Sequence, residues 1–309
     1  MKSIRFSGVM PILATPFHDD ETLDLHSWTR LLEFMVGLGV DGVTIIGVLG
    51  ESNRLADHER DVLIAHAVQI VAGRIPVVVG TSHSGTQAGK YLARRAAELG
   101  ADAVMITPGK EAVPNDERIV ETYKRIADGL AIPIVLQDHP ASSEVHMSVA
   151  LILRLLREIP AIECIKAEAV PTAPKLRQLI DGMAEKQRPI LTGLGALYAP
   201  FDLEAGAAGF NTGFAFPEVL MAMVSAAKLQ DWHRVHALYA RFAALIVFEQ
   251  QPGVAVRKEI LRRRGLLTSA RARHPGASLS PTAGRQLDRL LAATLPGVDI
   301  TLPILVCDA

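Results

Sequence analysis

The sequence predicts an α/β fold, a (β/α)8 TIM barrel with a C-terminal helical extension. The first observation is a set of eight short apolar runs, each about four to six residues long and bounded by Gly, Pro or Asp. Their β-branched composition is typical of strands that are buried on both faces. The runs are Val9–Leu13, Gly42–Ile46, Ile75–Val79, Ala103–Ile106, Ile132–Leu136, Ile162–Ile165, Pro189–Leu191 and Phe210–Phe214.

The second observation is that helical patterns separate these runs. Apolar residues recur there at the spacing of an amphipathic helix, most clearly in Leu55–Val71, Ala88–Leu99, Glu117–Ala127 and Val149–Leu156. A glycine follows several predicted helices and suits a left-handed helix end; these glycines are Gly39, Gly73, Gly100 and Gly129. Strands that alternate with helices pair in parallel and are covered on both faces.

A closed barrel and an open doubly wound sheet both satisfy this alternation. Eight regular units over about 210 residues favour the barrel, and no Gly-x-Gly-x-x-Gly motif follows the first strand. After Pro217 the patterns are helical, over Glu218–Lys228, Trp232–Phe248, Val254–Arg264 and Thr282–Ala293. We therefore predict a catalytic barrel over residues 1–217 and a helical cap over residues 218–309 in the same structural unit.

The composition bounds the class of protein. The chain has 309 residues, of which 49% are hydrophobic and 21% charged, and its net charge is −1. No basic run is interleaved with aromatic residues, which argues against a nucleic-acid partner. Two cysteines, Cys164 and Cys307, form no disulfide framework, and no stretch approaches the roughly 18 apolar residues of a membrane span. We expect a cytoplasmic protein without a membrane partner.

Lys166 is the strongest candidate for chemistry. Active sites of these barrels lie at the carboxyl ends of the strands, and Lys166 ends the sixth apolar run. Because strand side chains alternate, Cys164 and Lys166 share a face, which points inward if Glu163 points towards the helices. Burial lowers the pKa of a lysine, and the neutral amine attacks a carbonyl carbon to form an imine. Two structural alternatives are an amine that reaches water and a buried salt bridge to Glu51 or Glu168.

Several segments resemble the dihydrodipicolinate synthase / N-acetylneuraminate lyase family of class I aldolases. The likeness covers nearly the whole chain and rests on Gly8–Phe17, Val40–Val43, Gly47–Ser52, Ile75–Gly80, Ile165–Lys166 and Val256–Leu261 with Gly265. The resemblance implies that Lys166 is the Schiff-base lysine and that the loop of residues 47–52 receives the substrate carboxylate. It also implies a homo-oligomer, either a homo-tetramer or a homo-dimer.

The chain departs from the family pattern at its polar positions. The family has a hydroxyl pair where this chain has Val48 and Leu49; backbone N–H groups around Leu49 and Gly50 remain available for a carboxylate. Gln137 replaces a tyrosine that moves protons, and Thr107-Pro108 leads to Gly109-Lys110 where a second tyrosine is usual.

Proton transfer then needs another group. Asp138 and His139 follow the fifth predicted strand and are the best candidates, because an imidazole titrates near neutral pH. A loop histidine bonded to the backbone is the alternative for His139. Gln137 donates and accepts hydrogen bonds but transfers no proton. The predicted catalytic set is therefore Lys166, Asp138, His139 and Gln137.

The predicted substrate-binding set comprises Gly47, Val48, Leu49, Gly50, Glu51, Ser52, Thr15 and Phe214. Within it we expect Glu51 to order the loop rather than react. His233 and His236 lack a third ligand at metal spacing, so we expect no metal, and no motif indicates a cofactor.

The predicted function is a Schiff-base lyase, either aldolase or dehydratase, that acts on pyruvate or another 2-oxo acid. One alternative is authentic 4-hydroxy-tetrahydrodipicolinate synthase, which condenses pyruvate with aspartate semialdehyde. The other is a catalytically altered barrel that only binds 2-oxo acids, motivated by the three departures at polar positions.

Overall fold

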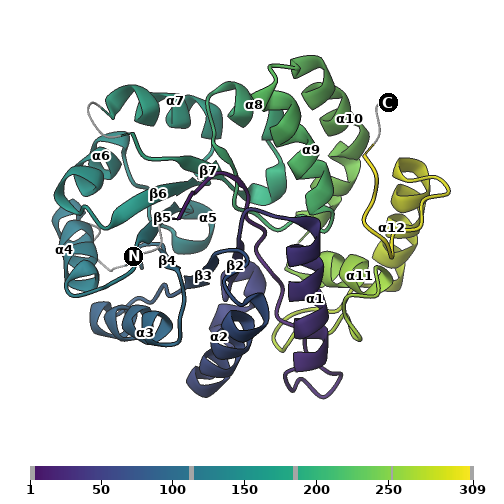
Figure 1. Ribbon diagram of the computed structural model, residues 1–309, viewed down its shortest axis with the longest axis horizontal. Coiled ribbons are helices and arrows are strands. Elements are labelled where there is room, and N and C mark those ends of the chain that lie inside the picture. The colour runs from purple at the N-terminus through teal and green to yellow at the C-terminus, as the bar shows by residue number, and fades with distance from the viewer. Residues whose placement is uncertain (1–3, 111–114, 184–186, 252, 307–309) are drawn as a thin grey trace.

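The computed structural model describes residues 4–110, 115–183, 187–251 and 253–306, and Cys307 lies outside them. Eight parallel strands form one sheet in the order β1-β8-β7-β6-β5-β4-β3-β2, with helices around it (Figure 1). The strands are β1 Gly8–Val9, β2 Val43–Ile45, β3 Val77–Gly80, β4 Ala103–Ile106, β5 Ile134–Asp138, β6 Ile162–Ala167, β7 Ile190–Thr192 and β8 Gly209–Phe210.

The sheet closes on itself between β1 and β2. A parallel bridge joins Ile12 to Thr44, and the N–H of Thr44 donates to the carbonyl of Pro11 at 2.8 Å. The predicted barrel is therefore confirmed. β1 and β8 contain two residues each, fewer than predicted. Hydrogen bonds nevertheless continue beyond β1, from the N–H of Met10 to the carbonyl of Phe210 at 2.8 Å and from the N–H of Ile12 to that of Thr212 at 2.9 Å.

Eight helices follow the strands around the outside of the barrel (Figure 1). They are α1 Leu25–Leu38, α2 Asp57–Val71, α3 Thr86–Glu98, α4 Asp116–Ala127, α6 Val149–Glu158, α7 Thr172–Gly182, α8 Ala199–Glu204 and α9 Pro217–Lys228, with a short α5 at Pro140–Ser143. The four glycines predicted to end helices all have positive φ, between 70° and 94°. The apolar pattern does not predict α7 or α8.

The extension contains α10 Trp232–Glu249, α11 Ala255–Arg263 and α12 Pro281–Thr294. α10 packs against α8, α9 and α12. α9 lies against β1, so it covers the barrel like the other helices, although the sequence pattern assigns it to the cap. α11 lies against the loop after β2, where its Lys258 forms an ion pair with Glu51 at 2.5 Å.

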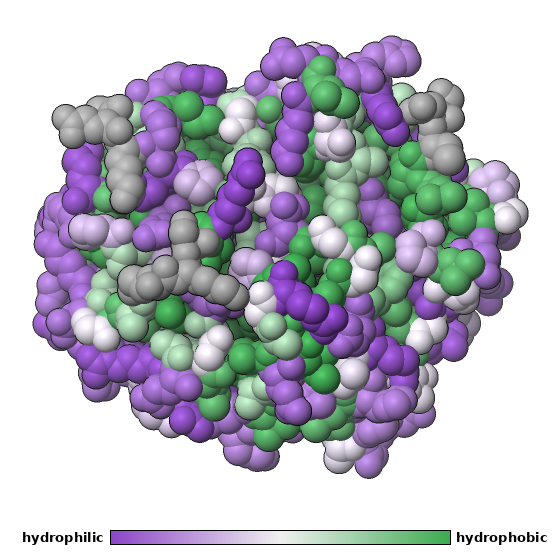
Figure 2. Space-filling model, viewed as in Figure 1, coloured by the Kyte–Doolittle hydropathy of each residue, from purple (hydrophilic) through white to green (hydrophobic). Residues whose placement is uncertain are grey.

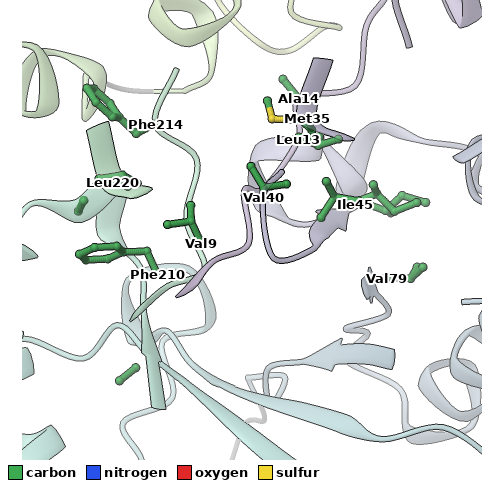
Figure 3. Close-up of a cluster of buried hydrophobic side chains, with 14 of the residues drawn as sticks. Val9, Leu13, Ala14, Met35, Val40, Ile45, Val79, Phe210, Phe214 and Leu220 are labelled. Atoms are coloured by element: carbon green, nitrogen blue, oxygen red, sulfur yellow. The ribbon is translucent and has the colours of Figure 1, made fainter. Parts of the chain in front are cut away.

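The core has two parts. Cys164, Met105 and Val135 belong to a cluster inside the barrel, which confirms Cys164 as a core residue. The larger cluster lies between the sheet and the helices, and Figure 3 shows Val9 and Phe210 within it. On the face shown in Figure 2, hydrophilic residues cover most of the outer rim, where helices lie. None of the helices in the described ranges has the length and apolar character needed to cross a bilayer.

Candidate active site

Lys166 lies on β6 with its side chain inside the barrel. Cys164, two residues earlier on the same face, belongs to the inner cluster, and Lys166 pairs in register with Gln137 of β5. The lysine is 2% exposed and lines a cavity of about 140 Å³ together with Gln137, His139 and Glu168. The amine therefore has the buried, inward position that strand alternation predicts.

The closest charged partner of this amine is Glu168. Nζ of Lys166 lies 3.2 Å from Oε2 of Glu168. The same carboxylate accepts hydrogen bonds from Nε2 of Gln137 at 2.7 Å and from the N–H of Leu194 at 3.2 Å, and Nδ1 of His139 lies 4.0 Å away. The salt bridge to Glu168 that the sequence leaves open as an alternative is thus present, but it lies inside the cavity.

Burial and charge set the protonation of this group. Burial lowers the pKa of Lys166, although the Glu168 carboxylate opposes the shift. Burial also lowers the pKa of His139, which favours the neutral imidazole. Burial raises the pKa of the Glu168 carboxyl, but Lys166, His139 and the two hydrogen bonds lower it by more. The pKa of Glu168 therefore lies below its usual value. The site therefore combines an anionic carboxylate with an amine that loses its proton readily.

A tight turn after β7 holds Glu168 in place. A Cβ at Gly193 would lie 2.0 Å from Oε1 of Glu168, so this position has room only for glycine. Leu194, Gly195 and Ala196 then have positive φ values of 51°, 63° and 66°, a costly conformation for the two residues with side chains. The turn directs the N–H of Leu194 at the carboxylate.

The structure separates the two predicted proton-transfer residues. His139 lines the cavity, and its Nδ1 lies 2.7 Å from Oγ of Ser142. Asp138 points to the other face of β5, where its Oδ2 pairs with Nζ of Lys175 at 2.6 Å. Because Gln137 faces inward, its neighbour in the strand faces the helices. The expectation that Asp138 reaches the substrate is corrected: the structure does not bring it to the cavity.

The loop after β2 meets the cavity with two residues, Val48 and Leu49. The N–H of Gly50 is already bonded to the carbonyl of Gly47 at 2.9 Å, so Gly50 is not the carboxylate donor that the sequence suggests. Thr15 donates to the carbonyl of Gly50 at 2.6 Å and supports the loop from behind.

The other predicted binding residues also lie outside the cavity lining. Glu51 is buried and pairs with Lys258 and Arg54, contacts that suit a residue that orders the loop. The backbone carbonyl of Ser52 accepts a hydrogen bond from the guanidinium of Arg60. Phe214 packs against Phe216 with ring centroids 5.8 Å apart, in the cluster between sheet and helices (Figure 3). Thr15, Gly47, Gly50, Glu51, Ser52 and Phe214 are therefore corrected to supporting positions.

Sequence reasoning assigned no catalytic or binding role to several cavity residues. Glu168 follows Lys166 by two positions and shares its face, a signal that the strand period contains. Thr212 extends from the end of β8. Glu249 and Arg257 come from α10 and the following helix α11, and no strand-based pattern points to them.

Comparison with known proteins places the chain in a family. The family model of the dihydrodipicolinate synthetase family matches residues 5–294. The chain belongs to this family. It is 36% identical over 287 residues to L-2-keto-3-deoxyarabonate dehydratase of Azospirillum brasilense, across 92% of this chain and 93% of that one. It is 30% identical over 295 residues to 4-hydroxy-tetrahydrodipicolinate synthase of Chlorobium luteolum, across 94% and 98%.

A solved structure gives the same result. The crystal structure of dihydrodipicolinate synthase from Rhodopseudomonas palustris superposes with a TM-score of 0.88 at 34% identity, covering 93% of this chain and 97% of that one. The predicted family and barrel fold are confirmed. So is the predicted class: this member of the dihydrodipicolinate synthetase family is a lyase of the Schiff-base type.

Proposed function

We propose that the protein is a dehydratase for a 2-keto-3-deoxy sugar acid, with Lys166 forming the Schiff base and Glu168 moving the protons. The observation that carries this proposal is the buried Lys166–Glu168 pair at 3.2 Å on the wall of the cavity. The 36% identity to a 2-keto-3-deoxy acid dehydratase, over nine-tenths of both chains, supports the substrate class.

Imine formation needs an uncharged amine. The lowered pKa of Lys166 increases that fraction near neutral pH, and Glu168 lies close enough to take a proton from the ammonium. Nζ then attacks C2 of the substrate. The carbonyl oxygen leaves as water with one proton from Nζ and the proton that Glu168 had taken, so the carboxylate is anionic again. The resulting iminium withdraws electrons from the neighbouring carbon and so acidifies the C3 hydrogens.

Dehydration follows by a proton shift within the site. Glu168 removes a proton from C3, the electrons form an enamine, and the C4 hydroxyl leaves with the proton that Glu168 returns to it. One hydrogen and one hydroxyl leave as water, and no oxidant is needed. Water then hydrolyses the C=N bond, which releases the 2-oxo acid product and returns the free amine of Lys166. Gln137 orients the Glu168 carboxylate towards the cavity through its 2.7 Å hydrogen bond. The neutral imidazole of His139, which lies 4.0 Å from the same carboxylate, adds no second positive charge beside it.

The synthase alternative has an observation in its favour, the 30% identity to 4-hydroxy-tetrahydrodipicolinate synthase. Against it, Gln137 transfers no proton, and the carboxylate beside the amine provides acid–base catalysis suited to elimination. The two functions have different products, so a direct assay separates them.

The test combines borohydride trapping of the imine with an assay of catalytic turnover. Borohydride reduction with a 2-oxo acid should add mass at Lys166, and Lys166→Arg should show no adduct. Purified protein should dehydrate a 2-keto-3-deoxy pentonate and should not condense pyruvate with aspartate semialdehyde. Condensation without dehydration would establish the synthase instead, and trapping without any turnover would favour the binding protein.

The assembly and location belong to the same proposal. The family membership supports a homo-dimer or homo-tetramer, and light scattering on the purified protein measures its mass. The low cysteine content supports a cytoplasmic location, which fractionation of the source cells tests.

A further inference from the structure

Arg257 is a buried cation on the cavity wall that the proposed chemistry leaves unused. It lies on α11, is 4% exposed, and lines the cavity with Lys166. Its Nε donates to Oε2 of Glu249 at 2.9 Å. Among the residues that the structure describes, its Nη1 has no hydrogen-bond partner. A buried guanidinium N–H without an acceptor is costly, so this end of the side chain calls for a ligand.

Glu249 holds the guanidinium by one edge. Its Oε1 accepts from the N–H of Ala215 at 3.2 Å and its Oε2 accepts from Nε of Arg257, so both carboxylate oxygens are occupied. Arginine has five N–H donors in a planar fork. The contact through Nε fixes the plane of the group and leaves Nη1 for a second carboxylate.

The neighbours of Arg257 place it beside the loop after β2. A Cβ at Gly213 would lie 3.3 Å from Cζ of Arg257 and 2.5 Å from Cδ1 of Leu49. The absence of a side chain at Gly213 thus gives both groups their room. Leu49 and Val48 offer the cavity only apolar side chains, and the N–H of Gly50 is used within the loop.

The amine and the amide beside it already have partners. The charge of Lys166 faces Glu168, and the amide of Gln137 donates to the same carboxylate. The hydroxyl of Thr212 accepts from the N–H of Gly195 at 2.7 Å. Arg257 is therefore the cation of the cavity best able to receive an anionic substrate group.

We propose that Arg257 binds the carboxylate of the 2-oxo acid substrate through its Nη groups and makes the cavity selective for acids. The proposal rests on the proposed function and adds the residue that recognises the acid. Arg–carboxylate hydrogen bonds are charge-assisted and directional, so the contact orients the ketone while Nζ of Lys166 attacks it.

The experiment compares an acid with its uncharged ester. Borohydride trapping rates at Lys166 are measured with pyruvate and with methyl pyruvate, in the wild type and in Arg257→Met. The intrinsic reactivity of each ketone cancels when the ratio of the two rates is compared between the two proteins. We expect the preference for pyruvate over the ester to fall by about ten- to hundredfold in Arg257→Met, with trapping of the ester retained.

Two further variants keep the test decisive. Arg262→Met on the same helix removes an exposed arginine that pairs with Glu259 and should keep the wild-type preference. Arg257→Lys keeps the charge but loses the fork, and a preference reduced several-fold is expected; it carries the test if Arg257→Met does not fold. An unchanged preference in the Arg257 variants overturns the role of Arg257 alone. No adduct with either ketone in the wild type overturns the proposed function and this inference together.

Discussion

Two buried lysine–glutamate pairs in the described part of the chain differ in their surroundings. Lys166 and Glu168 are 3.2 Å apart, and Lys258 and Glu51 are 2.5 Å apart. Burial lowers the pKa of both lysines, that of Lys258 to about 8, while the paired glutamate opposes the shift in each case. Burial and a lowered pKa therefore do not distinguish a reactive amine from a structural one.

What differs is the space and the bonding around each nitrogen. Nζ of Lys258 also donates to the carbonyl of Arg271 at 2.6 Å and lies 4.4 Å from the ring centre of Phe17. Glu51 is held by Arg54 as well. Lys166 instead faces a cavity. The comparison teaches that a reactive amine needs an open approach for the substrate, and that a perturbed pKa is only a supporting sign.

The largest expected effect comes from Lys166→Arg. The guanidinium keeps a positive charge beside Glu168 but cannot lose its proton, so imine formation should stop and turnover should fall by at least about a thousandfold. Steady-state kinetics and mass spectrometry after borohydride measure this. Residual turnover close to that of the wild type would assign the chemistry to another residue.

Glu168→Gln should separate imine formation from proton transfer. The amide retains the shape of the carboxylate but does not act as a base, so dehydration should fall by about 10²–10⁴-fold while borohydride still traps the ketone at Lys166. Gln137→Leu is the matched control, since it removes the hydrogen bond that orients Glu168 and should have a smaller effect. Equal loss of trapping and dehydration would contradict this division of roles.

Lys258→Met should damage stability rather than chemistry. Removal of one partner from a buried ion pair costs about 3–5 kcal/mol, and the lower end is expected here because Arg54 also pairs with Glu51. Denaturant unfolding measures the loss, and the trapping rate at Lys166 in the folded variant should stay near that of the wild type. A variant that is fully stable but cannot form the imine would reverse the assignment of the two pairs.

The smallest effect is a dependence of stability on pH. The folded pKa of Lys258, about 8, lies below the unfolded value of 10.5, so between these values the unfolded chain binds more protons. The free energy of unfolding should therefore gain a rising contribution from about pH 8 to 10.5. The free energy from denaturant curves across this range should rise less in Lys258→Met than in the wild type, because the contribution of Lys258 is lost while that of Lys166 remains; identical pH slopes in the two proteins would contradict it.

The sequence predicts the barrel and Lys166 because both follow from local periodicity. Strand alternation from Ile162 correctly orients the lysine inward, and the same rule extended by two residues reaches Glu168. Because the apolar run ends at Lys166, Glu168 is predicted from the sequence only as a salt-bridge partner and not as a catalytic group. The predicted fifth strand ends at Leu136, whereas β5 continues to Asp138. Alternation along the longer strand places Gln137 and Asp138 on opposite faces, which the shorter predicted strand could not show.

Arg257 and Glu249 are a different case. They come from α10 and the following helix, far along the chain from the barrel strands. Their place beside Leu49 depends on how the extension packs, and α11 is tied to the loop after β2 through Lys258 and Glu51. No local pattern contains this tertiary information, whereas the positions of His139 and Val48 followed directly from the strand ends.

The bare backbone at Gly193 has a consequence for enzyme redesign. The oxygen of Glu168 occupies the volume that a methyl group at this position would need. An alanine there forces the carboxylate away from the amine, while the glutamate itself stays in the sequence. Position 193 therefore gives protein engineers a way to move the carboxylate of Glu168 away from Lys166 without changing either residue.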